Sequence, residues 1–482
     1  MSRTSRPWRP AVPAIGGPRD ILRPHLVFLY ICFIYIAFPS NHFNADGLHY
    51  NLIAYLSTAR PSALFRDQSV PAHFLWHVMS LGLLRVFRPE SPEQSLYILR
   101  TANIALALGS IFVFMRLVRS LAGEMTAAWA TIALAFSHAC LREFLSVEVY
   151  SLSTLMAMIL MLYVHGATRA GTSTPHAGQA VAMGLLTGLA IAAHIANLLL
   201  VVPLAVITCA GGVRRGVRPA GIFALSLAAF LTAMILVMSS LASSDPGLAL
   251  RSLFGYWKAR DVYLSSDLVG NLQIALRTTL ESSLGRFGIW MLVPVAAYTL
   301  FAARHWRLLR DRVWLLFLAT WIVALGALVS QWDPSNLEHK VALIPIVLML
   351  AASIHAMTRD KLPRALKAGA IVLAGALVAV GIVEGILPFT DLQTDQLYRL
   401  SEEIHEQSQA PEVLLVGLVS ERRGDAVVLS SMTFFDQRVL LISSADRSYE
   451  ERIAQRAREG GDILTMIDGH PRRQLPPVGR LR

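Results

Sequence analysis

The sequence has few charged residues and few cysteines for its length of 482 residues. Charged side chains make up 16% of the chain, against about 25% in soluble globular domains. The three cysteines, Cys32, Cys140 and Cys209, all lie in hydrophobic stretches, which excludes a disulfide framework and a cysteine metal motif. A glycine-rich phosphate loop and a repeat of solenoid period are also lacking, so the sequence excludes those two architectures.

Hydrophobic residues, in contrast, make up 54% of the chain, and the mean hydropathy is +0.51. These values indicate an integral membrane protein dominated by lipid-facing helices. The formal net charge is +11, but most Lys and Arg residues stand between hydrophobic stretches, as they do in cytoplasmic loops. We therefore exclude nucleic acid as a partner and expect membrane lipid around the chain.

About eleven stretches are long and apolar enough to cross a membrane, when shorter segments between other helices are included. They cover residues 25–40, 96–118, 123–141, 148–165, 179–193, 195–211, 218–242, 287–304, 313–330, 341–357 and 367–386. Residues 71–87 are also apolar, but they carry His73, His77 and Arg85. We expect this additional stretch to lie along the membrane surface.

The positive charges predict the orientation. If residues 71–87 do not cross the membrane, the basic N-terminus and the basic short loops all fall on the cytoplasmic side, as the positive-inside rule requires. The loops concerned lie near residues 116–119, 169, 214–218, 304–312 and 359–367. We predict a multi-pass protein of a bacterial inner membrane, with residues 1–24 in the cytoplasm and the C-terminus in the periplasm.

The C-terminal part, residues 387–482, has a different composition from the hydrophobic part, residues 25–386. A charged helical stretch around Glu402 precedes short runs that are typical of strands. These runs cover residues 412–418, 426–430, 438–443 and 462–467, with a charged helix at about 449–458. We predict an all-α polytopic membrane domain followed by a small periplasmic α/β domain.

Polar residues at the ends of the apolar stretches define a candidate site. An ionisable group beside a membrane span is costly, so its presence requires a reason. The predicted topology, which rests on positive charges alone, places all of these polar residues on the outer face. They are Asp46, Glu148, Tyr150, His194, Asp333, Asn336, Glu338, His339 and Lys340.

Two motifs carry a resemblance to a known family. Residues 146–152, Ser-Val-Glu-Val-Tyr-Ser-Leu, are similar to the Glu-Val-Tyr-Ser-Leu motif of bacterial protein O-mannosyltransferase-like members of the GT-C glycosyltransferase superfamily. Residues 186–190, Leu-Thr-Gly-Leu-Ala, with His194 after them, resemble a second segment of that group. The resemblance implies transfer of a sugar from a polyprenyl-phosphate carrier at the outer membrane face. It also implies that Asp46 is the catalytic acidic residue, an Asp carboxylate, of the first external loop and that residues 71–87 form juxtamembrane helices.

The residue types suit this chemistry. Asp46 can take the proton from an attacking acceptor hydroxyl, although an Asp at this place could equally cap a helix. Basic side chains would stabilise the charge that develops on the leaving polyprenyl phosphate. The basic candidates are Arg60, Arg66, Arg100, Lys258, Arg260 and Lys340. Glu148 could hold sugar hydroxyls, orient a neighbour or, with Asp46, bind a divalent cation, and the sequence leaves these alternatives open.

We therefore predict a hexosyl- or pentosyltransferase that uses a polyprenyl-phosphate sugar and a protein, lipid or glycan acceptor. A transporter or flippase of a lipid-linked or small polar substrate is the main alternative. Transporters usually show internal symmetry and polar groups at mid-membrane depth, whereas here the polar groups gather at one end. An O-antigen polymerase or ligase is a further alternative, and only the motif resemblance argues against it.

The predicted topology can be tested with reporter fusions. We expect external signals after Phe43, Asp245 and Glu403, and internal signals after Arg169, Arg215 and Arg310, because the basic loops stay in the cytoplasm. An external signal at Arg215 would contradict the eleven-span topology.

Overall fold

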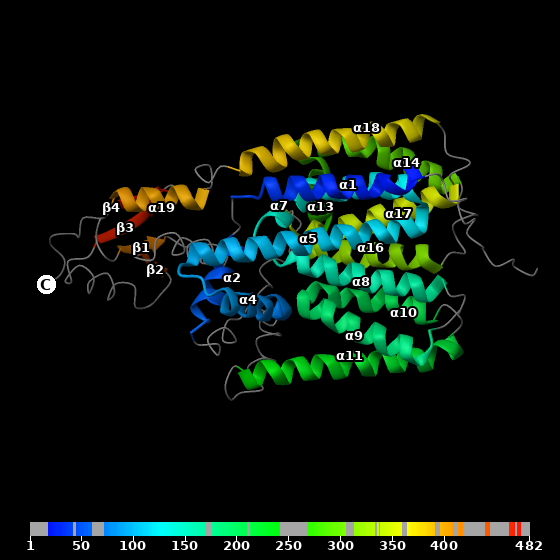
Figure 1. The fold of residues 1–482 in the computed structure, drawn as a ribbon, viewed down its shortest axis with the longest axis horizontal. Helices are drawn as coiled ribbons and strands as arrows, with labels where there is room; N and C mark the ends of the chain where they lie inside the picture. The colour runs from blue at the N-terminus through cyan, green and yellow to red at the C-terminus, as the bar shows by residue number, and fades with distance from the viewer. Residues whose placement is uncertain are drawn as a thin grey trace, which may run out of the picture.

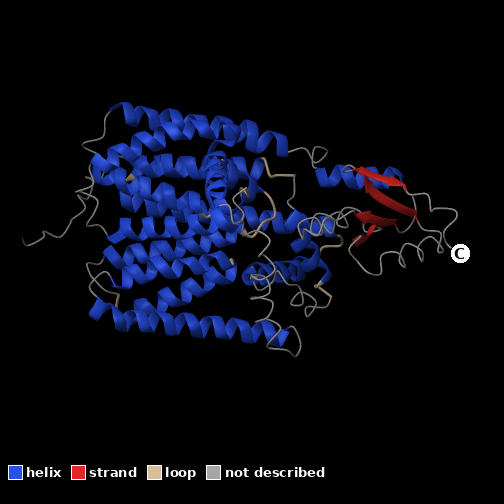
Figure 2. Cartoon of the chain, turned by 180° about the vertical axis from the view of Figure 1, so that it is seen from behind, coloured by secondary structure: helices blue, strands red, loops and turns tan. Residues whose placement is uncertain are grey.

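The structure is a computed structural model. It describes residues 18–41, 45–59, 72–169, 175–209, 213–241, 268–304, 313–332, 335–336, 338–358, 364–390, 396–407, 413–417, 439–443, 462–467 and 470–473. Long helices run side by side in one bundle, and a small group of strands lies beyond one end of it (Figure 1). Figure 2 shows the same division, with the strands confined to the C-terminal part.

The bundle is built from helices along nearly the whole hydrophobic part. Its first half contains α1 (Pro18–Ala37), α5 (Pro92–Ala122), α6 (Glu124–Ala135), α7 (His138–Leu145), α8 (Tyr150–Arg169), α9 (Ala177–Ala193), the 3-10 helix η2 (Ile195–Leu200), α10 (Val201–Cys209) and α11 (Val213–Leu241). The second half contains α13 (Leu268–Leu284), η4 (Gly285–Met291), α14 (Leu292–Arg304), α16 (Val313–Trp332), η5 (Glu338–Lys340), α17 (Leu343–Thr358), α18 (Arg364–Val380), the π-helix η7 (Gly381–Ile386) and η8 (Leu387–Phe389).

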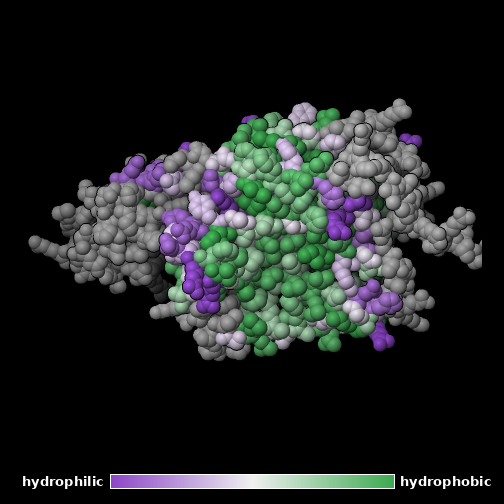
Figure 3. All heavy atoms as spheres, in the orientation of Figure 1, coloured by the Kyte–Doolittle hydropathy of each residue, from purple (hydrophilic) through white to green (hydrophobic). Residues whose placement is uncertain are grey.

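Within the described residues, six helical segments have the length and apolar character needed to span a bilayer. They are Pro92–Ala122, Tyr150–Ala167, Gly216–Ser240, Val313–Ser330, Glu338–Thr358 and Val372–Phe389. Four shorter apolar helices accompany them: Pro24–Ala37, Phe74–Phe87, Ala177–Ala193 and Ile195–Thr208. Hydrophobic side chains cover the middle of the bundle, and hydrophilic ones gather toward its two ends (Figure 3). The chain is an α-helical multi-pass membrane protein, as predicted, whereas the count of eleven crossings stays a prediction.

The helix boundaries follow local sequence signals. Helix α5 begins after Ser91, whose hydroxyl accepts the Gln94 N–H at 3.3 Å, and Pro92 occupies the first helical position. It ends at Gly123, whose φ of 83° suits glycine.

The predicted span 123–141 is a single helix in our interpretation, but the structure divides it into α6 and α7. The Ser137 hydroxyl donates to the carbonyl of Leu134 at 2.9 Å, and the chain resumes its helix at His138. Helix α7 then continues to Leu145, beyond the predicted end. The Ser137 hydroxyl thus supplies a partner for a carbonyl at the end of α6.

Helices α9 and α11 pack closely through glycines of α9. A Cβ on Gly184 would lie 2.8 Å from the carbonyl oxygen of Phe223 and 3.1 Å from the Leu227 nitrogen. A Cβ on Gly188 would overlap the ring of Phe230. Small residues let the backbones of membrane helices approach one another. The second predicted motif segment therefore contains a packing glycine.

In the described residues of the C-terminal part, four strands form a sheet, with α19 (Gln396–Gln407) beside it. The strands are β1 (Val413–Gly417), β2 (Val439–Ser443), β3 (Asp462–Ile467) and β4 (His470–Arg473), in the order β2-β1-β3-β4. Strand β1 is parallel to β2 and β3, with Val413 opposite both Val439 and Asp462, whereas β3 and β4 are antiparallel.

The first three strands match predicted strands. The sequence did not predict β4, which contains Pro471 and forms an edge of the described sheet, a position that tolerates proline. The predicted strand 426–430 and helix 449–458 lie outside the described residues. The periplasmic location and the domain boundary at residue 387 stay predictions.

The packing of α9 on α11 gives a stability prediction. We expect Gly184→Ala to destabilise the protein by about 1–3 kcal/mol, because the added methyl meets backbone that cannot move aside. Gly178→Ala is the matched control on the same helix, where a Cβ meets nothing within 4 Å. Thermal unfolding in detergent should show a lower Tm for Gly184→Ala only, and equal values for both variants would contradict the packing argument.

Candidate functional site

Two short helices at one end of the bundle define where the site lies. Helix α2 (Ala45–Leu56) follows α1, and α4 (Phe74–Phe87) occupies the stretch predicted as juxtamembrane. Both pack near the start of α5, and α4 also contacts α9 (Figure 1). The surface orientation of residues 71–87 stays a prediction.

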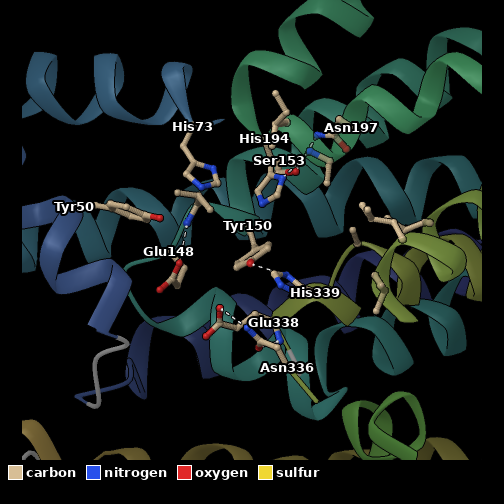
Figure 4. A pocket seen from close by; sticks show the side chains of 17 residues that line it. Tyr50, His73, Glu148, Tyr150, Ser153, His194, Asn197, Asn336, Glu338 and His339 are labelled. Atoms are coloured by element: carbon tan, nitrogen blue, oxygen red, sulfur yellow. Dashed lines mark hydrogen bonds between the residues drawn. The ribbon is translucent and has the colours of Figure 1, made fainter. Parts of the chain in front are cut away.

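A cavity of about 80 Å³ lies between these helices and the bundle. Figure 4 shows polar and aromatic side chains from several elements directed toward this space. The described lining residues are Tyr50, His73, Glu148, Val149, Tyr150, Ser153, His194, Ile195, Ala196, Asn197, Leu325, Leu328, Val329, Asn336, Glu338, His339 and Ala342. Apolar side chains of α16 close one side, and the polar groups come from helix ends and turns.

The turn between α7 and α8 carries Glu148. The last carbonyls of a helix have no partner within the helix, and here the Asn103 side-chain amide on α5 supplies one. It donates to the carbonyl oxygens of Glu143 at 3.1 Å, Phe144 at 3.4 Å and Ser146 at 2.7 Å. Asn103 is fully buried and Glu148 is only 1% exposed. Helix α8 begins at Tyr150, so Glu148 lies in the turn before the helix and not in its first turn, as the predicted span 148–165 implied.

Tyr150 and the loop before α17 meet across the cavity. The Tyr150 hydroxyl lies 3.3 Å from His339 Nδ1, within hydrogen-bonding distance. Within this loop, the Asn336 side-chain oxygen accepts the Glu338 N–H at 2.9 Å. Glu338 is 9% exposed and lines the cavity. A second carboxylate therefore shares this small space with Glu148.

His194 has a fixed role in the backbone and also faces the cavity. Its Nδ1 accepts the Ala196 N–H at 3.1 Å, which caps η2. In the neutral imidazole the proton must then be on Nε2, which makes this atom a donor. The ring lies against His73, with centroids 4.7 Å apart, and against Tyr150, at 5.4 Å.

Asn197 ties this turn to α8. Its amide donates to Ser153 Oγ at 3.0 Å and to the Ala190 carbonyl at 2.8 Å. The second motif, residues 186–190, is thus followed by a turn that contacts α8 directly after the first motif, residues 146–152.

Four polar or aromatic lining residues were not predicted from the sequence: Tyr50, His73, Ser153 and Asn197. One signal was available for Tyr50, because it stands four residues after Asp46 and such positions share one face of a helix. Tyr50 packs against His73 with ring centroids 5.5 Å apart. The backbone of Asp46 belongs to the first turn of α2, whereas its side chain lies outside the described part of the structure.

The predicted basic residues do not gather at the cavity as far as the structure describes them. Arg100 Nη1 donates to the Ser40 carbonyl at 2.9 Å and to Asn41 Oδ1 at 2.6 Å, so it holds the segment that leads to α2. Lys340 is fully buried and is not among the described lining residues. Arg60, Arg66, Lys258 and Arg260, together with the acidic Asp333, lie outside the described residues.

Among the side chains that the structure describes, no three His, Cys, Asp or Glu groups come close enough to hold a metal ion. The predicted alternative of a divalent cation between Asp46 and Glu148 stays untested, because it involves the Asp46 side chain.

Comparisons with known proteins define the fold class. The family model described as the protein O-mannosyl-transferase TMEM260 N-terminal domain matches residues 97–214, a range that includes Asn103, Glu148, Tyr150 and His194. Among curated proteins none matches this chain.

Solved structures of membrane glycosyltransferases resemble this chain in fold. The chain is similar to ArnT from Cupriavidus metallidurans bound to undecaprenyl phosphate, with a TM-score of 0.58, 14% identity and 94% of both chains covered. It is also similar to the oligosaccharyltransferase AglB from Archaeoglobus fulgidus in complex with an inhibitory peptide and a dolichol-phosphate. That match has a TM-score of 0.52 and 11% identity, and it covers 93% of this chain and 69% of the other. The chain has the GT-C fold, and the resemblance predicted from the Glu148 motif is confirmed.

The contribution of the Asn103 side-chain amide to stability can be tested by substitution. Asn103→Leu keeps the size of the side chain but removes the hydrogen-bond donor of three buried carbonyls. We therefore expect the free energy of unfolding to fall by about 1–3 kcal/mol. Thr101→Val is the control, because Thr101 is exposed on the same helix and its hydroxyl bonds only to the Tyr97 carbonyl of that helix. An unchanged Tm for Asn103→Leu would show that the amide does not stabilise the turn.

Proposed function

We propose that the protein is a membrane glycosyltransferase that moves a sugar from a polyprenyl-phosphate donor to a protein, lipid or glycan hydroxyl at the outer membrane face. One observation carries the proposal: in a GT-C fold, the Glu148 motif, the His194 turn and the loop 336–339 surround one cavity beside the start of α2. These segments lie far apart in the sequence, so their meeting at one end of the bundle supports a shared site.

The structural neighbours support a lipid-linked donor. ArnT was solved with undecaprenyl phosphate and AglB with a dolichol-phosphate, and both ligands are polyisoprenoid phosphates. The likeness to ArnT extends over 94% of both chains. We infer the same class of carrier for this chain, with its phosphate at the end of the bundle where the cavity lies.

In the proposed reaction, Asp46 takes the proton of the acceptor hydroxyl as that oxygen attacks the anomeric carbon. The new glycosidic bond forms while the bond from the anomeric carbon to the phosphate oxygen breaks, and the electron pair leaves with the polyprenyl phosphate. Charge on that phosphate calls for a cation. Arg100 holds residues 40 and 41, and Lys340 is buried. The remaining candidates are Arg60, Arg66, Lys258 and Arg260.

The cavity residues would hold the sugar. Glu148 and Glu338 offer acceptors for sugar hydroxyls, and His194 Nε2 offers a donor. The rings of Tyr50, Tyr150 and His73 provide flat apolar surfaces beside these polar atoms. A small polar and aromatic cavity of this kind suits one sugar unit better than a long polar substrate.

The catalytic role of Asp46 is tested by Asp46→Asn. Sugar transfer should fall by roughly a hundredfold or more, because the amide cannot take a proton. A helix cap would tolerate the change, since Asn caps about as well as Asp. The assay follows radiolabelled mannose from undecaprenyl-phosphate mannose into envelope acceptors in detergent.

Glu93→Gln serves as the control, because Glu93 is an exposed acid in the first turn of α5, which packs against α2. Near-normal transfer by a well-folded Asp46→Asn protein would remove Asp46 from the mechanism. Attention would then turn to Glu148 and Glu338.

A further inference from the structure

The first turn of α2 is in direct contact with the turn that carries Glu148. The contact point is Gly47, which is buried. A Cβ at Gly47 would overlap the carbonyl oxygen of Val147, and it would lie 3.1 Å from the Val147 carbonyl carbon and 3.2 Å from Glu148 Oε1. The backbone of α2 at Gly47 therefore lies directly against the backbone of Val147, and the Glu148 carboxylate lies beside this contact.

Close approach, and not backbone conformation, is what requires glycine here. Among the described residues, the glycines with positive φ are Gly123 and Gly285, whereas Gly47 lies within an ordinary helix. Glycine weakens a helix relative to alanine. Glycine is therefore required at position 47 because it has no side chain, and not because of its backbone conformation.

Two elements contact the Glu148 turn. The Asn103 side chain on α5 donates to its carbonyls, and the backbone of α2 at Gly47 lies against the Val147 carbonyl. Neither element can shift without moving the Glu148 backbone. The contact at Gly47 therefore constrains the position of α2 relative to Glu148.

This contact sets the spacing of two residues of the proposed site. Consecutive Cα atoms are about 3.8 Å apart, so Asp46 and Glu148 each stand one residue away from the Gly47–Val147 contact. We propose that Gly47 is a positioning residue that sets the distance between the backbones of Asp46 and Glu148. This inference rests on the proposed function, in which Asp46 takes the proton and Glu148 holds the sugar.

The main test is Gly47→Ala with kcat and KM measured separately. A methyl group at this place moves the start of α2 away from the Glu148 turn, and a displacement of about 1 Å can lower a rate by about a hundredfold. We expect kcat for mannose transfer from undecaprenyl-phosphate mannose to fall by roughly tenfold to a hundredfold, with KM for the donor nearly unchanged. Gly82→Ala on α4 is the matched control, because a Cβ there meets nothing within 4 Å, and it should keep wild-type kcat.

A rescue variant separates positioning from general damage. Asp46→Glu lengthens the side chain by one methylene, so it should lower kcat in the wild-type background but raise kcat when added to Gly47→Ala. Such a gain is a coupling between the two positions. A well-folded Gly47→Ala protein with wild-type kcat would overturn the proposal, and so would a low kcat that Asp46→Glu does not improve.

A distance measurement tests the contact without any assay of transfer. Spin labels on Leu56→Cys and Tyr97→Cys, at exposed places on α2 and α5, should report a changed distance in Gly47→Ala and an unchanged one in Gly82→Ala. An unchanged distance in Gly47→Ala contradicts the proposed contact. If the distance changes but the wild-type protein transfers no sugar from polyprenyl phosphates, the proposed function fails while the contact at Gly47 stands.

Discussion

The cavity depends on one buried group, the side-chain amide of Asn103. Helix α7 ends inside the bundle, where backbone carbonyls without a partner are costly because little water reaches them. Asn103 donates to three carbonyls of this helix end and the following residues. With these carbonyls satisfied, the chain can leave the helix, pass through an irregular turn and place Glu148 at the cavity. The neighbouring turn after α9 uses the same solution, since His194 and Asn197 bind backbone there.

Much of the fold could be predicted from the sequence, because membrane helices are read from long apolar stretches. Helix covers most of each predicted span in the described residues, although span 123–141 is divided between α6 and α7. Six of the predicted site residues, Glu148, Tyr150, His194, Asn336, Glu338 and His339, line one cavity, because polar residues at the ends of neighbouring helices can meet at one end of a bundle. Their roles in catalysis and binding stay predictions.

The rest could not be predicted, since it depends on contacts between distant segments. Tyr50 lies on α2, and His73 directly precedes α4. Packing on α5 and, for α4, on α9 places these short helices, and the sequence alone does not show which helices they contact. The charge of Arg100 suggested a phosphate site, yet its guanidinium binds Ser40 and Asn41. A positively charged residue predicts on which side of the membrane its loop lies, but the groups that its side chain contacts depend on the fold.

A structure with undecaprenyl phosphate bound tests the central claim, that this cavity is the site of sugar transfer from a lipid carrier. We expect the phosphate at the cavity mouth, paired with a Lys or Arg side chain and at the same end of the bundle as Glu148 and the start of α2. A phosphate bound at the far end of the bundle would contradict the account.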